Sequence, residues 1–174
     1  MNKKYFIELA DYLCWADNKV ISWINAINEQ QWNQQACSSF NSIRNTAVHM
    51  VSAEKIWIDF WTRVDSPVYL SAQFEGSKKD LTDIWLRTSA RLQEFIDKYP
   101  EEKYQDLVRV GKPNGEVAQM SFWRTFPHMV NNTSYHRGQI VTLLRQAGFS
   151  DLSNTDLFTY YNLYHNSGEK TLFF

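Results

Sequence analysis

The chain has 174 residues, of which 44% are hydrophobic and 21% charged, and it includes 7 Trp, 9 Tyr and 11 Phe. This length fits a single domain over residues 1–174, and the aromatic content excludes a disordered chain. Lys plus Arg number 18 against 19 Asp plus Glu, a net charge of −1. Without a summed positive field, nucleic acid and an anionic membrane surface are not expected partners.

The N-terminal segment does not read as a secretion signal, because Glu8 and Asp11 interrupt its apolar stretch. No apolar run approaches the 18 or so residues that cross a bilayer. Cys14 and Cys37 form neither a disulfide framework nor a CxxC pair, so we expect two free thiols in a reducing compartment. These observations predict a cytoplasmic protein.

Hydrophobic spacing predicts long helices in the first half of the chain. Residues at alternating steps of three and four form the first apolar stripe: Phe6, Leu9, Leu13, Ala16, Val20, Trp23 and Ile27. A second helix is expected from Ile43 to Val64, with Asn41 or Ser42 as its N-cap. Its buried faces include His49 and Glu54, where a plain core would have aliphatic residues. Residues 66–79 show no period and indicate a long crossing connection.

The second half is expected to hold two more helices and a hairpin. Asp80 and Asp83 suit the start of a third helix, which Pro100 ends. The turn residues 112–115 separate two short β-prone runs, which predicts a hairpin. A fourth helix runs from about Ser121 to a C-terminal cap at Gly148, with Pro127 expected to kink its start or move it later.

These elements predict an all-α fold, a four-helix bundle with a long crossing loop and a minor β-hairpin before the last long helix. A further short aromatic helix is expected over residues 156–164. Such bundles build their sites from side chains that face inward from several helices.

Histidines and asparagine on the second and fourth helices are the candidate metal ligands. His49 lies on a buried face of the second helix, and on the fourth helix Asn132 and His136 lie one turn apart, so that their side chains can converge on one point. His128 is about 12 Å of helix rise from His136 and is a strained partner for it, because ligand nitrogens lie about 2.1 Å from a zinc-like ion, but it is well placed to share an ion with Asn132. Packed, hydrogen-bonded core histidines are the alternative interpretation. Glu54 is interpreted either as a carboxylate that serves the site or as a partner for an arginine between helices.

Two segments resemble the DinB/YfiT-like family of metal-binding four-helix bundles. They are NTAVHMVSAEKIW at residues 45–57 and HMVNNTSYHRGQIVTLLRQAG at residues 128–148. The resemblance implies a divalent metal, zinc or nickel, on one histidine of the second helix and two histidines four apart on the fourth. His49 and His136 match the first and last ligands, and Asn132 stands at the middle position. A carboxamide oxygen is a weak neutral donor that suits hard cations better than zinc.

The resemblance also implies a function. Some relatives are thiol-dependent transferases or isomerases in which the metal activates a low-molecular-weight thiol, or water, for reaction with a small-molecule substrate. We therefore expect a metal-dependent enzyme of this kind, with no assigned catalytic residue. The alternative is a non-catalytic small-molecule-binding or interaction module with a degenerate metal site. In either case a homodimer through aromatic helix faces is expected.

Overall fold

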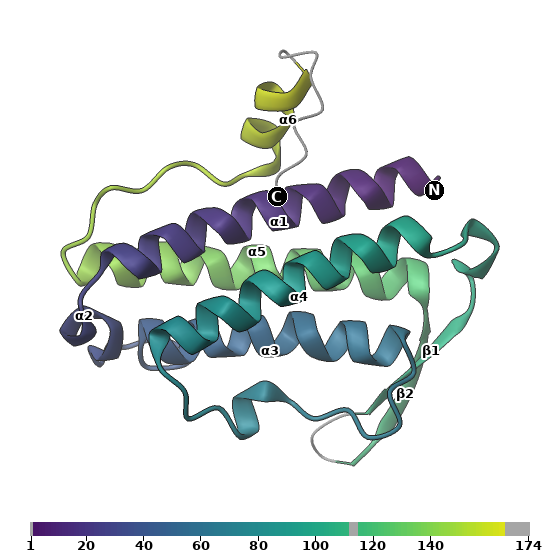
Figure 1. The fold of residues 1–174 in the computed structure, drawn as a ribbon, viewed down its shortest axis with the longest axis horizontal. Helices are drawn as coiled ribbons and strands as arrows, with labels where there is room; N and C mark the ends of the chain where they lie inside the picture. The colour runs from purple at the N-terminus through teal and green to yellow at the C-terminus, as the bar shows by residue number, and fades with distance from the viewer. Residues whose placement is uncertain (1, 112–114, 166–174) are drawn as a thin grey trace.

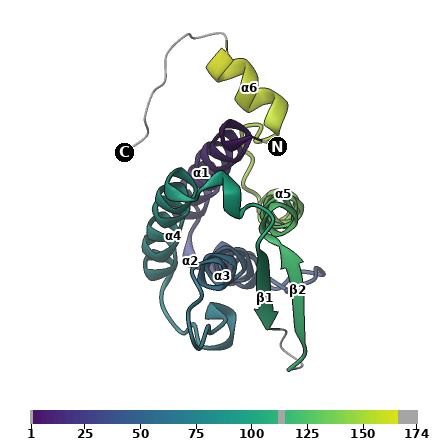
Figure 2. The same cartoon turned by 90° about the vertical axis from the view of Figure 1, so that its right-hand side faces the viewer.

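The computed structural model describes residues 2–111 and 115–165. Its core consists of four long helices, which Figure 2 shows nearly end-on. They are α1 (Lys3–Ala26), α3 (Ile43–Trp61), α4 (Lys78–Lys98) and α5 (Phe122–Gln146). α1 packs on α4, α3 on α5, and α3 also on α4, so the four helices enclose one interior. The predicted all-α bundle is confirmed.

The connections follow from the helix directions in Figure 1. α3 and α4 run the same way, so residues 62–77 must return along the bundle, and they form the predicted long crossing with a short turn of 3₁₀ helix, η1 (Leu70–Ala72). After α4, a second short turn, η2 (Glu101–Lys103), leads into the predicted antiparallel hairpin of β1 (Leu107–Gly111) and β2 (Val117–Ser121). The tail forms α6 (Leu157–His165), which lies beside α1.

Helix ends differ from the sequence predictions at three places. α4 begins earlier than Asp80, because Ser77 is the N-cap and Asp80 completes its capping box. Pro127 does not move the start of α5, since the first N–H groups of that helix donate to the carbonyls of Asp106 and Tyr104. An unpredicted single turn, α2 (Glu29–Asn33), follows α1.

Two predicted caps are confirmed, although α3 ends at Trp61, three residues before the predicted end at Val64. Ser42 caps α3 by accepting a hydrogen bond from the Asn45 N–H at 3.0 Å. Gly148 follows the end of α5 with φ of 84°, the left-handed conformation that a C-terminal cap needs. No helix in the described part of the chain is both long and apolar enough to cross a membrane.

The interior contains two apolar clusters with a polar layer between them. One cluster lies at the hairpin end and includes Phe6, Phe122 and Phe126; the other lies at the opposite end and includes Trp32, Trp85 and Leu144. Each long helix places a polar residue at the level between the clusters. This polar layer consists of Asp17 of α1, Glu54 of α3, Ser89 of α4 and Arg137 of α5, all buried.

Burial in the polar layer favours the protonated form of its carboxyl groups. Burial raises the pKa of Glu54 well above its ordinary value, and the nearby Asp17 charge raises it further. Burial also raises the pKa of Asp17 to about 6, although Arg137 opposes this shift. Two carboxylates cannot donate to each other, and the Trp85 indole beside both carboxyl groups has only one N–H to donate. A protonated Glu54 beside an Asp17 carboxylate balanced by Arg137 satisfies these groups best.

Two substitutions test this charge arrangement. Glu54→Gln keeps the shape of a protonated carboxyl group, so the free energy of unfolding at pH 7 should change by less than about 1 kcal/mol. Arg137→Met leaves the Asp17 charge buried without its counterion and should cost about 3 kcal/mol or more. Urea denaturation followed by circular dichroism measures both. A loss above about 2 kcal/mol in Glu54→Gln would show that Glu54 is ionised.

Candidate metal centre

The antiparallel packing of α3 on α5 sets the geometry of the site. Two ring contacts define the register: His49 meets His136 with ring centroids 4.5 Å apart, and Trp57 meets His128 at 5.4 Å. Each helix advances by eight residues between the two contacts. Midway between them, Ala53 of α3 therefore lies opposite Asn132 of α5. The sequence-predicted residues thus share one strip along the α3–α5 contact.

The two imidazoles form a compact pair. Their planes are inclined by 77°, so the edge of one ring faces the other. The His136 side chain is buried, at 7% exposed, whereas His49 is only partly buried. Phe40, in the segment before α3, stacks on His49 at 4.2 Å and touches His136 at 5.4 Å. Phe40 covers one side of the pair and restricts the motion of both rings.

Gln139 fixes the protonation pattern of His136. The Gln139 Oε1 atom lies 2.8 Å from His136 Nδ1, and because this carbonyl oxygen can only accept, Nδ1 must carry the proton. The lone pair of the neutral ring is then on Nε2, where a metal ion can bind. The Gln139 amide in turn donates to Ser39 Oγ at 3.1 Å, which holds the glutamine in place.

His49 is kept neutral by its surroundings. Burial, together with the proximity of His136, lowers the pKa of His49 to about 4. A neutral imidazole is the form that binds a metal ion, so protons do not compete for this nitrogen near neutral pH.

The middle position does not supply a third imidazole. Asn132 lies one turn before His136 and is partly exposed. His128 does not take its place, because it is exposed, packs against Trp57 and stands two turns, about 12 Å, from His136. Within residues 2–111 and 115–165, no group of three or more His, Cys, Asp or Glu side chains could hold a metal ion. The arrangement therefore offers two imidazoles and one carboxamide as potential ligands.

Glu54 belongs to the interior rather than to the histidine pair. It is fully buried near Asp17 and Arg137, away from the histidine pair, and Asp17 rather than Glu54 is the carboxylate that balances this arginine. Sequence reasoning missed Asp17, because one acidic residue in an amphipathic helix resembles a solvated position. It also missed Phe40 and Ser39, which precede α3 in a segment without a periodic signal.

A bundle that brings imidazoles from two facing helices to one strip is a scaffold typical of metal-binding helical proteins. The sequence model of the DinB family matches residues 1–170, and the chain belongs to this family. Protein DinB of Bacillus subtilis (strain 168) is 24% identical over 153 residues, which cover 84% of this chain and 88% of that protein. The crystal structure of a DinB-like protein from Bacillus cereus ATCC 10987 shares the fold, with a TM-score of 0.66 at 14% identity. That similarity covers 84% of this chain and 95% of the other.

The low pKa of His49 predicts a pH dependence of stability in the metal-free protein. An imidazole with a folded-state pKa near 4 and an ordinary value of 6.5 takes up protons more readily when unfolded. Its stabilising contribution is therefore complete above pH 6.5 and is lost as the pH falls through 4. Because water screens this partly exposed ring, we expect a loss of about 1 kcal/mol.

The raised pKa of Asp17 makes the folded state more stable as the pH falls, which is opposite to the effect of His49. Comparing the wild type with His49→Gln separates the two effects. Urea denaturation at pH 7 and pH 4 should show a larger acid-induced loss in the wild type than in His49→Gln. Equal losses would mean that His49 titrates normally.

Proposed function

We propose that His49 and His136, with the Asn132 carboxamide or a water in the third position, bind a divalent cation such as zinc or nickel. The observation that carries the proposal is the imidazole pair, with centroids 4.5 Å apart and the Nε2 lone pair of His136 left free by Gln139. The low pKa of His49 adds support, because its imidazole is available as a neutral ligand near neutral pH.

The proposed activity is transfer or isomerisation that depends on a low-molecular-weight thiol. A bound divalent cation lowers the pKa of a thiol or water ligand, so that the anion exists near neutral pH. The chain's own residues orient this chemistry: Gln139 holds His136, and Phe40 shields one side of the imidazole pair from water.

A second candidate is a small-molecule-binding or interaction module without catalysis. The observation that favours it is the carboxamide at position 132, which leaves two imidazoles where a catalytic zinc site uses three protein ligands. Metal affinity and thiol activation, measured separately, distinguish the two candidates.

Restoring an imidazole at the middle position should strengthen metal binding. In Asn132→His, the pair at positions 132 and 136 would present two nitrogens from one helix face, and the small Ala53 opposite leaves space for the larger ring. We expect zinc affinity to rise by more than about tenfold, measured by titration calorimetry on protein purified without an immobilised-nickel step. Unchanged affinity would place the metal elsewhere or exclude it.

Thiol activation can be observed directly in cobalt-substituted protein. Addition of β-mercaptoethanol should produce a thiolate-to-cobalt charge-transfer band in the wild type and in His128→Ala, and no band in His136→Ala. His128 is the matched control, because it is a histidine of the same helix outside the imidazole pair. Cobalt binding without a thiolate band would favour the binding module. A band that persists in His136→Ala would contradict the proposed ligand set.

A further inference from the structure

A hollow lies at the other end of α3 from the histidine pair. It has a volume of about 290 Å³ and opens between the C-terminal half of α4 and the end of α3. Thr62, where α3 ends, is thirteen residues beyond His49, or about 20 Å along the helix. We call this hollow the α4 groove. The residues that line it include Thr62, Arg91, Glu94, Phe95, Lys98 and Tyr99. Its size fits one small ligand.

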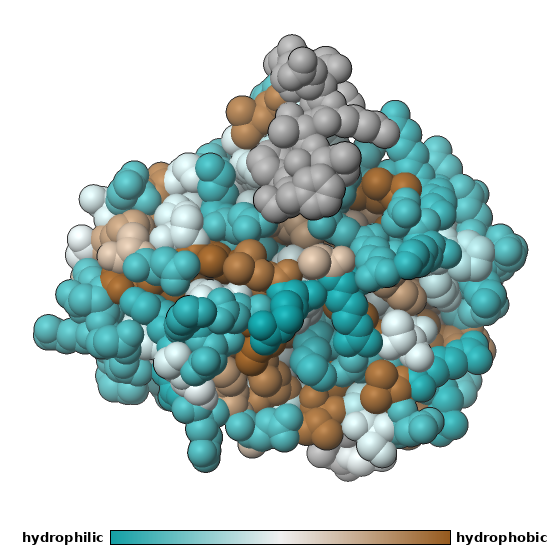
Figure 3. Space-filling model, in the orientation of Figure 1, coloured by the Kyte–Doolittle hydropathy of each residue, from teal (hydrophilic) through white to brown (hydrophobic). Residues whose placement is uncertain are grey.

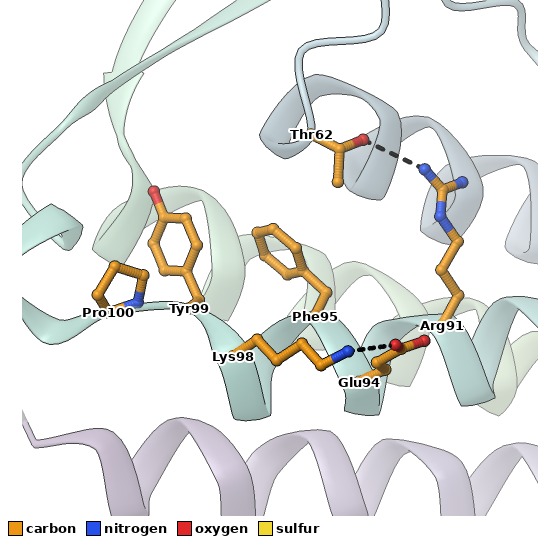
Figure 4. Close-up of a pocket in the computed structure, with 7 residues that line it drawn as sticks. All are labelled: Thr62, Arg91, Glu94, Phe95, Lys98, Tyr99 and Pro100. Atoms are coloured by element: carbon orange, nitrogen blue, oxygen red, sulfur yellow. Dashed lines mark hydrogen bonds and ion pairs between the residues drawn. The ribbon is translucent and has the colours of Figure 1, made fainter.

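The floor of the α4 groove is aromatic and rigid. Figure 4 shows the rings of Phe95 and Tyr99 side by side, pointing from α4 into the space below the end of α3. Behind them, Phe95 stacks on Trp61 at 5.7 Å with planes 13° apart, and Tyr99 packs on Phe122 at 4.2 Å. The core therefore holds both rings in place while they remain accessible from the groove. Such a floor favours a flat aromatic ligand.

The polar rim carries charges of both signs. One buried carboxylate, Asp59, is shared by two cations: Lys55 at 2.6 Å and Arg91 at 2.8 Å. Lys98 is paired with Glu94 at 2.6 Å, and this pair is neutral and exposed. Arg63 and Asp106 near Tyr99, and Asp97 near Lys98, bring the surrounding charges into balance. Figure 3 shows the hydrophilic character of α4 on this face, with apolar side chains between it and its neighbours.

Arg91 is positioned to receive an anion without leaving its partners. Its Nη1 donates to Asp59, and its Nη2 donates to Thr62 Oγ1 at 3.2 Å, so the guanidinium is fixed at the groove's end (Figure 4). A guanidinium has five N–H donors, and these two bonds leave others for a ligand.

We propose that the α4 groove binds a planar aromatic monocarboxylate, with its ring against Phe95 and Tyr99 and its carboxylate on Arg91. The N–H groups of Arg91 that Asp59 and Thr62 leave unused favour a carboxylate over a neutral group. A neutral ring of the same shape keeps the stacking and loses the charge-assisted hydrogen bonds to Arg91. This site is independent of the metal proposal, since it shares no residue with the histidine pair.

Ligand-observed NMR with 2-naphthoate as the probe tests the proposal, with 2-naphthamide as the neutral isostere. For a ligand of this size we expect a dissociation constant of about 1 mM. The naphthoate should bind at least about fivefold more tightly than the amide to the wild-type protein. In Arg91→Gln this preference should disappear, whereas Lys55 still balances Asp59 and preserves the fold.

Lys79→Gln is the matched control, because it removes a lysine from an equivalent exposed pair with Asp83 at the start of the same helix. It should leave naphthoate binding unchanged. Backbone amide resonances of residues 91–99 should shift in the wild-type protein on addition of naphthoate, which localises the site even if Arg91→Gln fails to fold. Equal binding of naphthoate and naphthamide, an equal loss in Lys79→Gln, or shifts confined to the vicinity of His49 and His136 would overturn the proposal.

Discussion

The polar layer in the middle of the bundle constrains how the four helices can align. Its members come from different helices: the charged Asp17 and Arg137 from α1 and α5, and the protonated Glu54 from α3. A slide of α1 or α5 by a turn would bury a charge against the apolar clusters without its partner, at a cost of several kcal/mol, and a slide of α3 would bury the Glu54 carboxyl group away from its polar neighbours. The axial alignment of α3 with α5 is therefore fixed from within. The histidine pair follows from it, because His136 directly precedes Arg137 and His49 lies little more than a turn before Glu54.

The same layer also ties the C-terminal segment to the bundle. Arg137 donates through Nη2 to the Tyr12 hydroxyl, to Ser134 Oγ at 3.1 Å and to the Thr155 carbonyl at 3.4 Å. Tyr12 in turn donates to that carbonyl at 3.0 Å. One guanidinium thus compensates an interior carboxylate and anchors the chain that leads to α6. Arg137 therefore contributes both to the packing of the C-terminal segment and to the charge balance of the core.

The main helices and the hairpin could be predicted from the sequence because their signals are local. Spacings of three and four residues mark α1, and turn residues between two β-prone runs mark the hairpin. α2 escaped prediction because five residues are too few for a helical period, although Asn28 and Gln31 form its capping box. The start of α4 was misplaced because an acidic pair resembles a first turn, whereas Ser77 is the N-cap.

Only the part of the candidate metal centre that lies within a single helix could be predicted from the sequence. The spacing of Asn132 and His136 is a property of one helix, but their approach to His49 depends on packing between helices. Asp17 could not be identified as an interior charge, because its partners are far away in sequence. The α4 groove likewise depends on the end of α3 meeting the second half of α4, which no local pattern encodes.

The position of Ala53 opposite Asn132 bears on how this scaffold can diverge. Both residues lie on a partly exposed strip, outside the two apolar clusters and the polar layer that stabilise the bundle. Replacing a side chain there would change the proposed donor set with little effect on folding, since exposed positions tolerate substitution. The chemistry of the proposed site is thus separable from the stability of the scaffold that holds it.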